Sequence, residues 1–264
     1  MLITSTPEQL PGNRPPKAQS ASVTLYHMDP GHHREASVWH DADHKAEVIA
    51  SVPHVFVSQR WVTPPSWMAL RPPSELPEGG GEYVNVYWSS GTAEALSEDF
   101  NRLGADLGAV GRMDTVRYMH LIWPTGAHSR LRPIYLETRP GLAISAAAVT
   151  ASTAMTGLVA TVGSSPAGDD FDRWHETEYL PKVLATNLFA GAAKLALDQP
   201  DHPGGYITLL YTDAPSPADT YVEYREQLRA WGADPNGVPD AWPGHTSIFE
   251  TVAQPSIGRY DVYD

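Results

Sequence analysis

The 264-residue sequence contains no cysteine. Disulfide bonds, thiolate catalysis and cysteine-built zinc or iron–sulfur sites are therefore excluded, and any metal would have to be held by His, Asp or Glu. Positive charge is also scarce, because 18 Lys and Arg face 31 Asp and Glu, which gives a formal net charge of −13. A nucleic-acid surface needs clustered cations, so we expect neither nucleic acid nor another polyanion as a partner.

Long apolar runs and phosphate-binding loops are missing as well. No stretch reaches the roughly 18 apolar residues that a membrane helix needs. The N-terminus has no charged leader followed by an apolar core, so we expect a cytoplasmic protein with no membrane partner. Gly79-Gly80-Gly81 precedes a predicted strand instead of following one, and nucleotide binding is not predicted.

One short signature is present twice. Residues 39–44 read WHDADH and residues 174–179 read WHETEY, so both match Trp-His-acid-x-acid followed by His or Tyr. Internal repetition of this kind predicts two copies of one domain, each of ordinary size. A hydrophobic content of 42% supplies enough apolar side chains for two cores. We expect an N-terminal arm at 1–20, a first domain at 21–125, a connecting segment at 126–153 and a second domain at 154–264.

The hydrophobic pattern of each copy predicts the same order of elements. The predicted strands of the first copy are 21–26, 54–62, 82–88 and 114–123, and its helices are 34–51 and 92–107. The second copy repeats this order with strands 156–162, 190–197, 206–212 and 246–252 and helices 169–186 and 218–231. The order β-α-β-β-α-β is the ferredoxin-like plan, so the expected fold class is α+β with two ferredoxin-like repeats. Residues 130–137, between the copies, either add a strand or cross between the sheets.

The helices that carry the repeated signature resemble those of the EthD-like family in the dimeric α+β barrel superfamily. Residues 171–181 keep the tryptophan and proline of the family, with Tyr179 where the family usually has histidine. His44 keeps that histidine, and Lys45-Ala46 replace the proline. The resemblance implies two sheets placed face to face within one chain, with a cavity between sheet and helices as the site.

The same resemblance implies several chemistries without choosing among them. It implies cofactor-free cyclases, dehydratases, decarboxylases, isomerases or monooxygenases that act on aromatic or polyketide-like molecules, and also haem enzymes. Our leading expectation is a cofactor-independent lyase or isomerase, a cyclase or dehydratase of natural product biosynthesis, with a hydrophobic small molecule as substrate.

Candidate catalytic residues lie mainly in the first copy, which holds most of the histidines. His40 and His44 are four residues apart and share one helix face, and an imidazole can exchange protons at neutral pH. We expect His44 to be the general acid or base, with assistance from His40 and Asp43. His120, between apolar neighbours, is either a cavity residue or a satisfied core histidine.

Candidate substrate-binding residues come from both copies. Tyr179 and His175 share one helix face in the second copy, where Tyr179 either positions the substrate or only packs. Arg60 could hold an enolate or carboxylate if it points inward, although an outward, solvated arginine is the more ordinary case. The tryptophans expected in the wall of the site or its packing are Trp39, Trp88 and Trp174.

Two other functions remain open. One is a haem enzyme, with His44, His120 or His175 as iron ligand, although the Gly-x-x-Asp-Gly signature of dye-decolourising peroxidases is absent. The other is a non-catalytic small-molecule binding protein. A divalent metal between His40 and His44 is less favoured, because Asp41 and Asp43 are expected to point elsewhere and no third ligand is identifiable. The sequence allows a monomer or a homodimer.

Overall fold

The computed structural model describes residues 17–74, 81–123, 131–165, 169–197, 204–232 and 246–263. Most of the predicted N-terminal arm lies outside these ranges, and Ser20 already belongs to the first strand. No helix within the described ranges combines the length and apolarity that crossing a bilayer requires.

The first repeat follows the ferredoxin-like order. Its strands are β1 (Ser20–Met28), β2 (Val55–Val62), β3 (Tyr83–Ser89) and β4 (Met119–Trp123), and its main helices are α1 (His33–Trp39), α2 (Lys45–Ser51) and α4 (Ala93–Ala109). Shorter elements are the π-helical turn η1 (His40–His44), α3 (Pro65–Met68) and the 3-10 turn η2 (Asp114–Tyr118). The antiparallel pairings give the strand order β4-β1-β3-β2.

The second repeat has the same plan. Its strands are β6 (Gly157–Ser164), β7 (Gly191–Leu197), β8 (Gly205–Thr212) and β9 (Thr246–Pro255), in the order β9-β6-β8-β7. Its helices are α6 (Asp169–Trp174), the π-helical turn η3 (His175–Tyr179), α7 (Leu180–Ala185) and α8 (Pro217–Ala230). The expected α+β fold with two ferredoxin-like repeats is confirmed.

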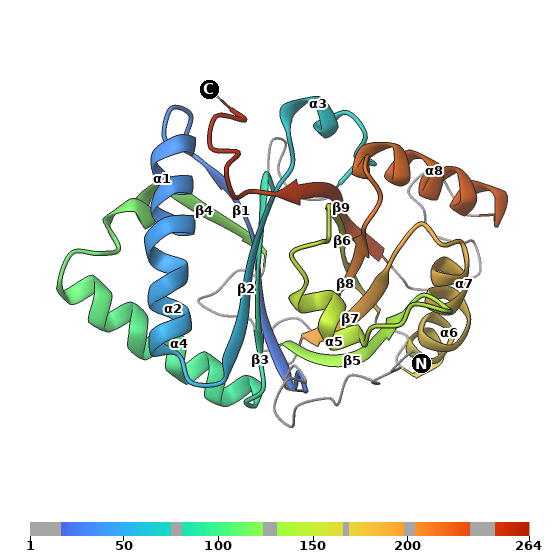
Figure 1. Cartoon of the computed structure of the whole chain (residues 1–264), viewed down its shortest axis with the longest axis horizontal. Helices are drawn as coiled ribbons and strands as arrows, with labels where there is room; N and C mark the ends of the chain where they lie inside the picture. The colour runs from blue at the N-terminus through green and yellow to red at the C-terminus, as the bar shows by residue number, and fades with distance from the viewer. Residues whose placement is uncertain are drawn as a thin grey trace, which may run out of the picture.

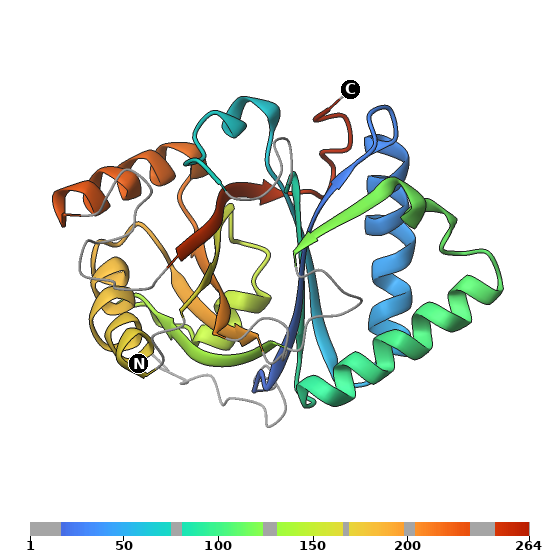
Figure 2. The ribbon, with the colours of Figure 1, turned by 180° about the vertical axis from the view of Figure 1, so that it is seen from behind.

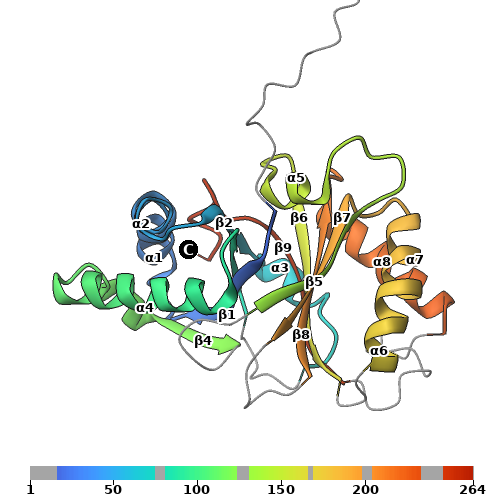
Figure 3. The same ribbon diagram turned by 90° about the horizontal axis from the view of Figure 1, so that it is seen from below.

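The two sheets join into one barrel. β2 pairs with β9 on one side, and β5 (Leu131–Thr138) pairs with both β7 and β1 on the other. The connecting segment therefore both adds a strand and crosses between the sheets, and it also contains α5 (Ala146–Ala151). Helices α1, α2 and α4 cover the outer face of the first sheet, and α6, α7 and α8 cover that of the second (Figures 1 and 3).

The interior of the barrel is a packed apolar core. Large buried side chains from both sheets meet there, among them Trp61, Trp88, Ile207 and Tyr211. Trp61 and Tyr211 contact each other edge to face, with ring centroids 6.1 Å apart. Trp88 is fully buried in this core, so it contributes to packing between the sheets, and a functional site has to be sought on the outer faces, under the helices.

Three elements differ from the sequence-based expectation, and one of them is the predicted helix 169–186, which the π turn η3 interrupts. The predicted helix 34–51 is interrupted at its centre by the π turn η1, which hydrophobic periodicity does not reveal. The predicted strand 114–123 is wrong in its first half, where residues 114–118 form the 3-10 turn η2 and only residues 119–123 pair with β1. The turn is closed by the Val116 amide, which donates to the Met113 carbonyl.

Candidate active site

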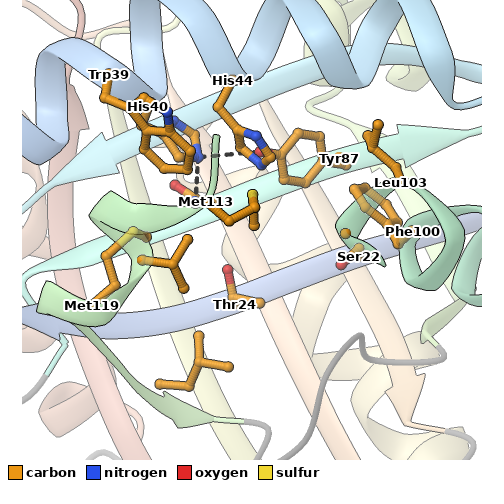
Figure 4. A pocket seen from close by; sticks show the side chains of 14 residues that line it. Ser22, Thr24, Trp39, His40, His44, Tyr87, Phe100, Leu103, Met113 and Met119 are labelled. Atoms are coloured by element: carbon orange, nitrogen blue, oxygen red, sulfur yellow. Dashed lines mark hydrogen bonds between the residues drawn. The ribbon is translucent and has the colours of Figure 1, made fainter. Parts of the chain in front are cut away.

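A cavity of about 240 Å³ lies between the outer face of the first sheet and the helices that cover it (Figure 4). Its polar side chains come from β1, β3 and η1. Its apolar wall comes from α4 and the segment that follows it. The lining residues used below are Thr24, Trp39, His40, His44, Asn85, Tyr87, Phe100, Met119 and Leu121.

The repeated signature folds into a π turn in both halves. η1 spans His40–His44 and η3 spans His175–Tyr179, at the same place in each repeat. Isolated π turns within α-helices are rare and often lie at functional sites. In the first half the turn directs His40 and His44 to the cavity and places Asp41 in the space beneath the helix.

His44 is a largely buried imidazole on the cavity wall, with 15% of its side chain exposed. Its ring stacks on Trp39 with centroids 4.7 Å apart and an interplanar angle of 15°. Burial lowers the pKa of His44 to about 4, although the charge of Asp43 opposes this shift. The Nδ1 atom lies 3.5 Å from Oε2 of Glu47. His44 is therefore neutral at pH 7 and able to accept a proton, with a carboxylate close enough to stabilise the resulting charge.

His40 is buried more deeply. Its Nε2 atom lies 2.8 Å from Nδ2 of Asn85 and 3.1 Å from the Tyr87 hydroxyl. Burial lowers the pKa of His40 to about 3, although hydrogen bonding to Asp41 opposes this shift. Both histidines of the turn are thus neutral, but His40 is held by neighbouring side chains and His44 faces the cavity.

A buried ion pair supports the turn from below. Arg60 is 2% exposed, and its Nη1 atom lies 3.3 Å from Oδ2 of Asp41. Asp41 also contacts Nζ of Lys45 at 3.1 Å. Burial disfavours the Asp41 carboxylate, but hydrogen bonding with His40 and the charge of Arg60 outweigh it and hold the pKa of Asp41 well below its usual range. The expectations of a solvated Arg60 and of an Asp41 that points elsewhere were wrong, because η1 and β2 bring the two charges together.

The C-terminal segment of the second half completes this support. Ser256, directly after β9, donates its hydroxyl to Oδ2 of Asp41 at 2.8 Å and its amide to the Arg60 carbonyl. Farther along, the ring of Tyr263 stacks on His33 of α1. The last described residues thus lie against the first half (Figure 2).

Two predicted catalytic residues lie outside the cavity. Asp43 is half exposed and pairs with Arg112 at 2.6 Å on the surface. His120 is 44% exposed in its side chain, and its Nε2 atom lies 2.7 Å from Oδ1 of Asp29. Because side chains alternate along β4, Met119 and Leu121 line the cavity and His120 points away. His120 is therefore neither a cavity residue nor a core histidine.

The second half fills the space that the first half leaves open. Tyr179 occupies the position of His44, and its hydroxyl contacts that of Tyr224 at 2.6 Å. Helices α4 and α8 both start at a hydroxyl N-cap, Thr92 and Ser216. Phe100 and Tyr224 lie at the same distance after these N-caps and are therefore equivalent. This contact crosses the region equivalent to the cavity, so the structure gives Tyr179 a packing position.

The other residues predicted in the second half are also packed. His175 is buried, with its ring near those of Phe171, Tyr179 and Tyr206. Trp174 stacks on Tyr179 at 5.3 Å. Trp39 is thus the one of the three predicted tryptophans that lines the cavity.

Sequence reasoning missed several lining residues. Asn85 is the polar residue inside the buried apolar strand β3, and that contrast was a usable signal. Thr24 carried no comparable signal, because strand residues of its type are common. Within the described residues, no group of three or more His, Asp or Glu has the arrangement of a metal site.

The fold and the site together define a dimeric α+β barrel protein in which one chain supplies both ferredoxin-like units and one unit holds an open cavity. No protein-family model matches the sequence, and no curated protein shows significant similarity to it. The EthD-like family itself is therefore not shown.

Solved structures show where this architecture recurs. The chain is similar to a monooxygenase-like protein from Fusobacterium nucleatum (8% identity, TM-score 0.52, 90% of this chain and 91% of that chain covered). It is also similar to a dye-decolorizing peroxidase from Bacteroides thetaiotaomicron (7% identity, TM-score 0.53, 94% and 96% covered). An anthrone oxidase-like protein matches at 10% identity with a TM-score of 0.50 (90% and 92% covered). At these identities the similarity concerns the fold alone.

Proposed function

We propose that the cavity of the first half is the active site of a cofactor-independent enzyme that transfers a proton on a small hydrophobic aromatic molecule, with His44 as the general acid or base. The observation that carries this proposal is a neutral, largely buried imidazole on the wall of an otherwise largely apolar cavity. Within this class, a cyclase, dehydratase or related lyase or isomerase of the EthD-like type fits best.

The size of the cavity limits the substrate. An apolar cavity of about 150 Å³ holds one benzene ring, so the cavity of about 240 Å³ fits a molecule of one or two fused rings. Phe100, Met119 and Leu121 supply an apolar wall for such rings. Few polar groups face the cavity, which is typical of sites that bind apolar ligands and orient them by a small number of contacts.

The chemistry follows from the surroundings of His44. The neutral imidazole accepts a proton from an acidic C–H or O–H bond of the substrate, leaving the electron pair on an enolate or phenolate. Glu47, 3.5 Å from Nδ1, stabilises the imidazolium that forms. The imidazolium then returns the proton to another atom of the same molecule, or to a leaving oxygen, so that no external oxidant or reductant is needed.

Deuterium uptake tests the proton transfer directly. The probe is 2-tetralone, a two-ring ketone with acidic C–H bonds beside its carbonyl, incubated with the protein in D2O and analysed by mass spectrometry. We expect the wild-type protein to accelerate uptake and His44→Gln to lose about 10²–10⁴-fold of that acceleration. His120→Gln is the matched control, because His120 points away from the cavity, and it should exchange like the wild type.

Two results would contradict the proposal. One is deuterium uptake that persists unchanged in a folded His44→Gln protein. The other is binding of 2-tetralone, measured by calorimetry, without any uptake in the wild-type protein, which would favour a non-catalytic binding protein.

Haem does not fit the described site. The cavity of about 240 Å³ lies below the usual range for drug-sized ligands, and no Lys or Arg lines it to hold the two propionates. Of the three possible iron ligands, His44 lines the cavity, whereas His120 points away from it and His175 is enclosed by aromatic rings. An absorption spectrum of the purified protein tests this conclusion. We expect no Soret band, and a Soret band would contradict it.

A further inference from the structure

A directed series of hydrogen bonds ends at His40. The Nε–H group of Arg60 donates to the Tyr26 hydroxyl oxygen at 2.6 Å, and the Tyr26 hydroxyl donates to Oδ1 of Asn85 at 3.2 Å. Nδ2 of Asn85 lies 2.8 Å from Nε2 of His40. All four side chains are buried. We call this series the Arg60–His40 relay.

The direction of each hydrogen bond in the relay follows from the one before it. A guanidinium has only donors, so the Tyr26 oxygen must accept from Arg60, which leaves the Tyr26 proton for Oδ1 of Asn85. With Oδ1 fixed in this way, the NH2 group of Asn85 faces His40. The ring nitrogen Nε2 can then only accept, and the proton of the neutral ring has to lie on Nδ1.

The other side of His40 agrees with this assignment. Nδ1 lies 3.6 Å from Oδ1 of Asp41, so a proton on Nδ1 faces a carboxylate. The Tyr87 hydroxyl, 3.1 Å from Nε2, is a second possible donor to the same nitrogen. Arg60 itself is held by Asp41 and by the face of the Tyr83 ring, whose centroid is 4.1 Å from Cζ of Arg60.

We infer that Arg60, Tyr26 and Asn85 are positioning residues that lock His40 in its Nδ1–H tautomer, so that His40 does not exchange protons with a bound molecule. The sequence had indicated that His40 assists the acid–base chemistry. With the lone pair of Nε2 occupied, proton transfer is left to His44. The lock is a property of the protein alone, and only its catalytic consequence rests on the proposed function.

The second half provides an internal comparison. Strand register makes Gly163 equivalent to Tyr26 and Thr208 equivalent to Asn85. In the same way, Lys194 takes the position of Arg60. The signature histidine is retained there as His175, but the middle members of the relay are replaced and the space beside it is filled. Both halves thus carry the repeated signature, but the relay residues are found in the half that has the open cavity.

Nitrogen-15 NMR of the imidazole rings tests the lock in the ligand-free protein. The chemical shifts of the two ring nitrogens distinguish the tautomers, and a His40→Gln variant assigns the signals. We expect the wild-type ring to be protonated on Nδ1. Asn85→Asp replaces the donor with an acceptor of the same size, so we expect the proton to move to Nε2 or the ring to become charged at pH 7.

Two further variants keep the test decisive if Asn85→Asp fails to fold. Tyr26→Phe removes the donor that orients the Asn85 amide, and the Nε2–H form should become detectable. Thr24→Val is the matched control, because Thr24 neighbours Asn85 across β1 and β3 and lines the cavity but is not in the relay; its His40 tautomer should be that of the wild type.

The outcomes separate this inference from the proposed function. An Nε2–H tautomer in the wild-type protein, or an Nδ1–H tautomer that persists in every folded variant of Asn85 and Tyr26, overturns the lock. An intact lock together with no uptake of deuterium into 2-tetralone overturns only the proposed function.

Discussion

An Asp41→Ala variant is expected to unfold with a free energy about 3–5 kcal/mol smaller than that of the wild-type protein. Asp41 and Arg60 are both almost fully buried, and the carboxylate also contacts Lys45. Removing it leaves the Arg60 guanidinium charged in a region that excludes water, because an arginine does not lose its proton in proteins. Urea denaturation followed by tryptophan fluorescence measures the change.

The equivalent site of the second half supplies the control. Lys194 is fully buried, but it contacts both Asp172 and Glu176, and the Glu176 side chain is 27% exposed. Glu176→Ala therefore leaves one carboxylate in place and should cost about 1 kcal/mol or less. An Asp41→Ala/Arg60→Leu double variant should regain much of the lost stability. If Asp41→Ala and Glu176→Ala lower the free energy of unfolding equally, the Asp41–Arg60 pair does not stabilise the fold more than the Glu176–Lys194 pair.

The duplication and the fold were predictable because they depend on local patterns. Alternating apolar residues in strands and three- to four-residue spacing in helices are set by backbone geometry, and the repeated signature revealed that the pattern occurs twice. The third strands of the two copies, β3 and β8, pair with β1 and β6 in equivalent registers. Closure of the barrel by β5 depends on pairing between distant segments, and the sequence left two alternatives for it.

The details of the site depend on geometry that the sequence does not encode locally. An ideal helix would direct Asp41 away from His40, but the π turn brings both beneath the helix, and only then can Arg60 of β2 reach the carboxylate. Side chains alternate along β4, but the sequence does not show which face of this strand meets the cavity, and the structure places Met119 and Leu121 there instead of His120. The signature alone does not show that the second half is filled, because that depends on Tyr224 meeting Tyr179 from another helix.

Together, the titration of His40, His44 and Glu82 is expected to lower the stability of the protein by about 3 kcal/mol between pH 6.5 and pH 4.5. Burial lowers the pKa of His40 to about 3 and that of His44 to about 4, whereas both titrate near pH 6.5 in the unfolded chain. Below pH 6.5 the unfolded state binds protons that the folded state does not, so each histidine costs about 1.4 kcal/mol per pH unit.

Glu82 acts in the opposite direction over the same range. Burial raises the pKa of Glu82 to about 7, so between about pH 4.5 and 7 the folded state holds a proton that the unfolded state has lost, and this contribution to stability decreases as the pH rises. One carboxyl thus offsets about one of the two histidines, which is why the net loss on acidification is about 3 kcal/mol and not about 6.

Two substitutions separate these contributions. His44→Gln removes one of the two histidines. The opposing contributions of His40 and Glu82 then nearly cancel, so the stability of this variant should be almost constant from pH 6.5 to 4.5. Glu82→Gln removes the opposing carboxyl and should steepen the loss to about 5–6 kcal/mol. Urea denaturation at several pH values measures how the free energy of unfolding changes with pH in the wild type and the two variants. If the wild type and both variants lose stability equally on acidification, His44 and Glu82 titrate alike in the folded and unfolded chain, and burial does not lower the pKa of His44.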